Sequence, residues 1–76
     1  MRILEYRQRL GWSRLELARK AGLDYKTVKK AEGGELIHPK TAQAIARALS
    51  RALHERVTVE NIDGLLIQSA GEKKEI

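Results

Sequence analysis

Basic side chains dominate the first part of the chain, and the chemistry they offer is the binding of an anion. Residues 1–30 hold nine Lys or Arg against three Asp or Glu, whereas residues 31–76 hold six against seven. Lys29 and Lys30 follow Lys26 by three and four positions, the spacing that places side chains on one face of a helix. Lysines on such a face can bind phosphates or donate to guanine O6 and N7. The pattern indicates nucleic acid as a partner, although a solvated basic face alone would have the same composition.

No group of residues suggests catalysis or a metal site. The chain has no cysteine, and its two histidines are sixteen residues apart. The acidic residues are scattered, and no nucleophile has an obvious base. We therefore expect no enzyme activity, no cofactor, no metal and no small-molecule ligand. The lack of cysteine suits a reducing cytoplasm, and no apolar run approaches the roughly 20 residues that span a bilayer.

The basic residues must be positioned by helices, and one helix is predicted over residues 14–21. Ser13 can cap its start, and Glu16 three residues later completes a capping box. Gly22 suits the left-handed conformation in which many helices end.

A second helix is predicted over residues 25–32, after a very short turn. Only Leu23 separates Gly22 from Asp24, which can cap this helix, and two glycines follow its end. Two helices joined by so short a connection must cross steeply, which is helix-turn-helix geometry.

This stretch resembles the helix-turn-helix of the phage-repressor and Cro (XRE-like) family of bacterial transcription regulators. The matching positions are Leu17-Ala18, Ala21-Gly22-Leu23, Val28, and Glu32 followed by a glycine two residues later. The similarity extends roughly from Ile3 to Leu66. It implies a repressor-like regulator that binds specific sequences in double-stranded DNA, with helix 25–32 in the major groove.

The resemblance and the helix geometry together assign two groups of DNA contacts. The first turn of a recognition helix penetrates deepest into the groove, and the preceding helix crosses the backbone with its N-terminus toward phosphate. The residues expected to contact base edges are Tyr25, Lys26 and Lys30. The residues expected to contact phosphates are Ser13, Arg14, Thr27 and Lys29.

The resemblance also implies an ion pair between Arg7 and Glu32, because relatives often pair the residues at these positions. The pair would tie the first helix to the recognition helix. One departure from the family lies in residues 35–37, where relatives commonly carry a basic residue and this chain has Glu-Leu-Ile.

The expected fold is all-α, a compact five-helix domain over residues 1–67 followed by a flexible tail over 68–76. The helices are predicted over residues 2–10, 14–21, 25–32, from Pro39 to about Arg56, and in a short segment capped by Thr58. The fourth helix is about two turns longer than in relatives. Any strand is expected only at Val57–Val59.

A homodimer on DNA is expected, because one short recognition helix covers only a few base pairs. The candidate interface is the apolar material beyond the usual fold, namely Leu53, Val57, Leu65, Leu66 and Ile67. These residues could instead complete a small core. The competing function is a helical protein-interaction adaptor that keeps the repressor fold without reading DNA, which the loop at 35–37 and the long fourth helix favour.

Overall fold

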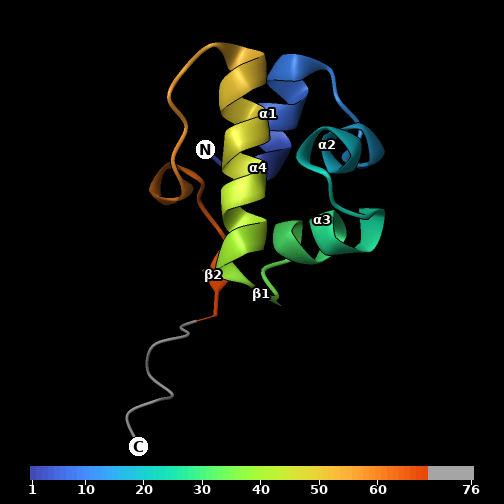
Figure 1. Ribbon diagram of the computed structural model, residues 1–76, viewed down its shortest axis with the longest axis vertical. Coiled ribbons are helices and arrows are strands. Elements are labelled where there is room, and N and C mark those ends of the chain that lie inside the picture. Colours follow the sequence, from blue (N-terminus) through green and yellow to red (C-terminus); the bar gives the residue numbers. More distant parts are fainter. Residues whose placement is uncertain (69–76) are drawn as a thin grey trace, which may run out of the picture.

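The computed structural model describes residues 1–68, which form four α-helices, one 3₁₀ turn and a two-stranded parallel sheet (Figure 1). The elements are α1 (Ile3–Leu10), α2 (Arg14–Ala21), α3 (Tyr25–Glu32), β1 (Leu36–Ile37), α4 (Pro39–Leu53), η1 (Val59–Asn61) and β2 (Leu66–Ile67). Over this part of the chain, none of the helices has the length and apolar character needed to cross a bilayer.

Helices α2 and α3 begin and end where the sequence predicts, because their caps form. The Ser13 hydroxyl accepts from the Glu16 N–H at 3.1 Å, and the Glu16 carboxylate accepts from the Ser13 N–H at 2.8 Å. Gly22 ends α2 with φ 71°, a conformation that a side chain at this position would strain. The Asp24 carboxylate accepts from the Thr27 N–H at 3.1 Å and so caps α3.

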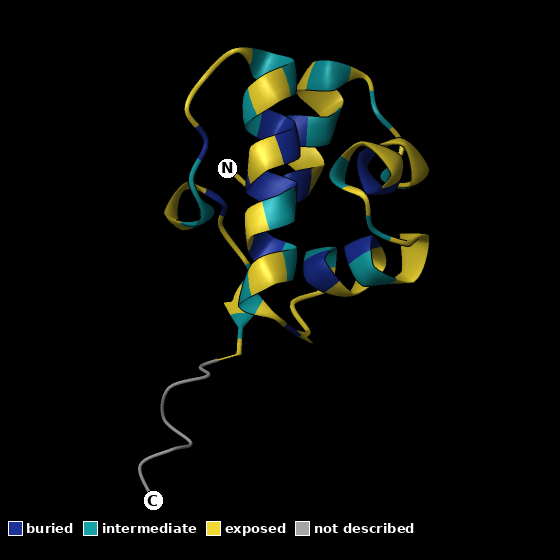
Figure 2. Cartoon of the chain, in the orientation of Figure 1, coloured by how far each residue is buried: buried dark blue, intermediate teal, exposed yellow. Residues whose placement is uncertain are grey.

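Helix α4 forms the centre of the core, with α1, α2 and α3 on one side and the segment from residue 55 to 67 on the other (Figure 1). Buried residues recur along the length of this helix (Figure 2). They are Ala42, Ile45, Ala46, Ala48 and Leu49. The same core contains residues of α2, α3 and α4 that are almost fully buried, namely Leu17, Ala18, Val28, Ile45 and Leu49.

The fourth helix is shorter than predicted, because it ends at Leu53 rather than near Arg56. His54 takes a left-handed conformation with φ 54° and breaks the helical run. The Ser50 hydroxyl then donates to the Val57 carbonyl and accepts from the Val57 N–H, both at 2.9 Å. These two bonds turn the chain back along α4 and bury Val57.

The prediction of a fifth helix was wrong. After Thr58 the chain makes only η1, in which the Asn61 side chain accepts from the Thr58 N–H at 3.0 Å. Ile62 is buried directly after that turn, and Gly64 with φ 85° redirects the chain into β2. The apolar residues that suggested a helix therefore reach the core from a turn and an extended segment.

The expectation of an all-α fold was also wrong in one respect, because β1 and β2 form a small parallel sheet. Leu36 pairs with Leu66, and Ile37 pairs with Ile67. Any strand was expected only at Val57–Val59, but no strand forms there and both strands lie elsewhere in the described residues. This pairing explains the unusual loop sequence, because Ile37 enters the core while Leu36 remains exposed.

The sheet continues to the last described residue. The Gln68 N–H donates to the Ile37 carbonyl at 2.8 Å, so Gln68, expected in the tail, is bonded to β1. The rest of the expected tail, residues 69–76, lies outside the described residues.

Replacing Ala18 by leucine should destabilise the fold by about 1–3 kcal/mol, because Ala18 is 1% exposed in α2, which packs against α3 and α4. The free energy of unfolding measured in urea will test this. Ala44→Leu, at a half-buried position of α4, is the matched control and should cost less. If both variants lower the free energy of unfolding equally, the crossing of α2 and α3 is not tightly packed.

Candidate nucleic-acid interface

Helix α3 has one buried face and one basic face. Val28 and Ala31 are buried against the core, whereas Lys26, Lys29 and Lys30 are exposed. Tyr25, at the first position of the helix, is also exposed. The structure therefore leaves all the base-contact candidates free to meet a ligand.

Arg7 and Glu32 lie together and fix the far end of α3 to α1. Arg7 Nε donates to Glu32 Oε2 at 2.6 Å, and Arg7 Nη2 donates to Glu32 Oε1 at 3.0 Å. Arg7 Nη1 also donates to the Trp12 carbonyl at 3.1 Å, in the turn before α2. The side chains of Arg7 and Glu32 are only 12% and 9% exposed. Planar two-point bonding of this kind restricts both distance and orientation.

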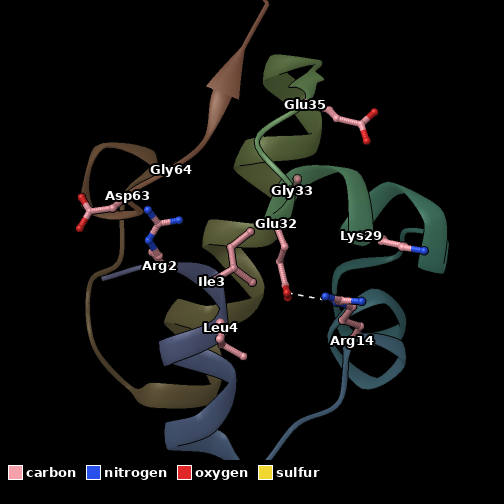
Figure 3. A pocket seen from close by; sticks show the side chains of 11 residues that line it. Arg2, Ile3, Leu4, Arg14, Lys29, Glu32, Gly33, Glu35, Asp63 and Gly64 are labelled. Carbon is pink, nitrogen blue, oxygen red and sulfur yellow. Dashed lines mark hydrogen bonds and ion pairs between the residues drawn. The ribbon is translucent and has the colours of Figure 1, made fainter.

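A second arginine joins the same carboxylate. Arg14 Nε donates to Glu32 Oε1 at 3.1 Å (Figure 3). The pKa of Arg14 is raised, first by the neighbouring Tyr25 hydroxyl and then by Glu32. Arg14 therefore links α2 to the C-terminal end of α3. The sequence assigned Arg14 to phosphate alone, and the spacing of 18 residues between Arg14 and Glu32 carries no signal that predicts this contact.

Arg7 and Arg14 together favour the ionised form of Glu32. Burial by itself would raise the pKa of Glu32, but hydrogen bonds and positive charges from Arg7 and Arg14 outweigh burial, and the pKa is lowered overall. Glu32 is thus a charged carboxylate that holds three helices together.

The expected phosphate ligands differ in what they can offer. Ser13 uses its hydroxyl oxygen as a cap acceptor, which leaves the hydroxyl proton for a phosphate. Thr27 instead donates its hydroxyl proton to Asp24 at 2.6 Å, and this bond is the largest of the causes that lower the pKa of Asp24. Thr27 would have to give up that bond to bind phosphate.

Arg14 and Lys29 line one cleft of about 380 Å³ between α3, the start of α1 and the turn at Asp63–Gly64 (Figure 3). Glu32 also lines this cleft and points toward Arg14 (Figure 3). Two phosphate candidates from different helices therefore border the same cleft. Lys26 and Lys30 are not among the residues that line the cleft.

The residues expected at a dimer interface are mostly engaged within the chain. Val57 is buried, and three others pack against the core: Leu53, Leu65 and Ile67. Only Leu66 is exposed. Four of the five residues therefore fit the alternative, completion of a small core, better than they fit a dimer interface.

Replacing Arg7 by methionine should lower the free energy of unfolding by up to about 3 kcal/mol, because Glu32 would keep only one of its two arginine partners. Affinity for DNA, measured on the folded protein, should fall much less. Arg9→Met is the control, since the Arg9–Glu55 pair is largely exposed and should contribute little. If affinity falls while stability is unchanged, Arg7 contacts phosphate and is not a structural residue.

Comparison with known proteins agrees with this geometry. The helix-turn-helix family model matches residues 3–55, more than half of the chain. Searches of curated proteins and of solved structures each found no match. The matched region contains α1, α2, α3 and α4, and therefore both arginines that bind Glu32. The chain thus belongs to the phage-repressor and Cro type of helix-turn-helix proteins, a family of DNA-binding transcription regulators.

Proposed function

We propose that this protein binds specific sequences in double-stranded DNA and acts as a repressor-like transcription regulator, with α3 in the major groove. The observation that carries the proposal is the exposed basic face of α3. The helix is fixed on its other side, where Glu32 accepts hydrogen bonds from Arg7 and Arg14. A reading helix must be fixed relative to the helix that contacts the backbone, since readout of base edges depends on position.

Base readout is assigned to Tyr25, Lys26 and Lys30. Tyr25 and Lys26 lie in the first turn of α3, and Lys30 lies one turn beyond Lys26 on the same face. Lysine can donate to guanine O6 and N7, and the Tyr25 hydroxyl can donate to a base or its ring can contact a thymine methyl.

Binding of the DNA backbone is assigned to Ser13, Arg14 and Lys29. Thr27 would bind a phosphate only if its hydroxyl gave up the hydrogen bond to Asp24. Arg14 is the strongest candidate, because its side chain is 37% exposed and, within residues 1–68, it bonds to Glu32 through Nε alone. Its terminal nitrogens can donate to a phosphate while Nε keeps the side chain in place. Glu32 would thus orient a phosphate ligand as well as α3.

The two features that favoured the adaptor function are weaker than the sequence suggested. The acidic and apolar loop forms β1, and its Ile37 belongs to the core. The fourth helix ends at Leu53. Within residues 1–68, packing of Ile37 in the core and the early end of α4 account for part of these two segments, so DNA binding is the better supported function.

The protein should act on DNA as a homodimer. One eight-residue helix reaches only a few base pairs, and two half-sites one helical turn apart, about 34 Å, would supply the missing specificity. Two symmetric copies would match a palindromic site.

Substitutions should separate the residues that read bases from those that bind phosphates. Once a preferred duplex has been selected from random sequences, Lys30→Ala should cost about 1–3 kcal/mol on that duplex and relax the preference at one base pair. Arg14→Ala should weaken binding to the preferred duplex and to random duplex alike. Lys20→Ala, which removes the same charge from α2 near Trp12, is the control and should change neither preference nor affinity strongly.

The measurement is the dissociation constant of each variant on the preferred duplex, on single-base changes of it, and on random duplex at one salt concentration. If Lys30→Ala and Lys26→Ala weaken all duplexes equally, the lysines bind phosphate and Tyr25 is left as the only reader. If no duplex is preferred over random DNA by the wild-type protein, sequence-specific binding is wrong.

A further inference from the structure

A small cleft lies between the C-terminal part of α4, the last turn of α2 and the turn before α2. Its volume is about 220 Å³, and it is lined by Trp12, Lys20, Ala48, Arg51 and Ala52. The Lys20 ammonium lies 5.9 Å from the centroid of the Trp12 ring. Ala48 and Ala52 are one turn apart on α4, so their methyl groups share one face of that helix. The cleft therefore combines apolar surface with two cations.

Within residues 1–68, no acidic side chain pairs with the two cations of this cleft. None of the lining residues is acidic, and the four ion pairs of this part of the chain include neither Lys20 nor Arg51. Glu16 and Glu55, each four positions from one of these cations, bond instead to the cap of α2 and to α1. Helix α4 has no Asp or Glu, and the exposed Arg47 lies one turn before Arg51. This surface therefore attracts an anionic group.

We propose that this cleft binds an acidic peptide segment of a partner protein, in which one apolar side chain is flanked by Asp or Glu. The apolar side chain would lie against the Trp12 ring and the two alanines. The flanking carboxylates would accept from Lys20 and Arg51, and the indole N–H of Trp12 is a further donor. An apolar anchor in a pocket with charged groups around it is a common arrangement in protein interfaces.

The size of the cleft favours a peptide over a small molecule. Small-molecule sites usually have volumes of roughly 300–1,000 Å³ and enclose most of the ligand. A cleft of about 220 Å³ has room for one side chain. The rest of a peptide would lie across the exposed Arg47 and Arg51 of α4, where its carboxylates find positive charge.

The cleft lies away from the residues proposed to meet DNA. Strand β1 contacts α3 and directly precedes α4, whereas Arg51 is twelve residues beyond Pro39, about 18 Å along the helix. Figure 1 shows the C-terminal end of α4 far from β1. Lys20 lies in the last turn of α2, whereas the proposed phosphate ligands Ser13 and Arg14 lie at its start. A peptide and a duplex can therefore be bound at the same time, and the inference goes beyond the proposed function.

Trp12 is the single tryptophan of the chain, so its fluorescence reports on the cleft directly. The probes are blocked pentapeptides, Glu-Glu-X-Glu-Glu, with leucine, phenylalanine or alanine at the centre, titrated at one ionic strength. The leucine and phenylalanine peptides should change the emission saturably, and the alanine peptide should bind about tenfold more weakly, because it buries less apolar surface. A bound random duplex should change these affinities little, since salt screens charges at that distance.

Two variants with matched controls test the residues of the cleft. Arg51→Glu should weaken binding of the leucine peptide by at least about tenfold. Arg19→Glu, also in the last turn of a helix but outside the cleft, should weaken it far less. Ala52→Leu fills the cleft without a change of charge and should weaken binding of the leucine peptide, whereas Ala44→Leu, half-buried elsewhere on α4, should not.

Equal losses of peptide affinity in Arg51→Glu and Arg19→Glu would mean that only the net charge of the chain attracts the peptide, and would overturn the proposal. Displacement of the peptide by duplex DNA would make the cleft a phosphate site and would also overturn it. The absence of a saturable change with all three peptides has the same consequence. Failure of the chain to bind DNA would leave the peptide site standing, so the two proposals are tested separately.

Discussion

The arrangement of the helices depends on one carboxylate. Glu32 closes α3, and it accepts from Arg7 of α1 and from Arg14 of α2. A carboxylate this buried is costly unless it is paired and hydrogen-bonded, so α3 is favoured only where both arginines can reach it. In a chain of 76 residues with a small core, such a contact does what extra apolar packing would do in a larger domain. It fixes the direction in which the lysines of α3 face.

The parts of the fold that follow from the sequence are those encoded by neighbouring residues. The capping box of Ser13 and Glu16, the glycine that ends α2 and the Asp24 cap each act within about one helical turn. Helical spacing of apolar residues likewise marked the buried face of α4. The expected basic face of α3 needed only these local signals. The approach of Arg7 to Glu32 is not local, and only the resemblance to a family suggested it.

The parts that could not be predicted depend on contacts between distant residues. The pairing of Leu36 with Leu66 joins segments thirty residues apart, and neither two-residue strand has a pattern of its own. The bonds between Ser50 and Val57 end α4 early although its apolar stripe continues. The apolar spacing after Thr58 fits a helix, but burial of Ile62 and the turn at Gly64 decide otherwise. The contact of Arg14 with Glu32 was missed for the same reason.

The central claim, that the basic face of α3 meets DNA, is tested most directly by titrating salt against binding to random duplex DNA. Lysines and arginines on phosphates release condensed counterions, so log affinity should fall steeply and linearly with log salt concentration. The slope should be about −0.9 for each phosphate neutralised, which for Arg14, Lys29 and their neighbours means several units in total. A flat response, or no binding at low salt, would contradict the account and restore a protein-binding role for the fold.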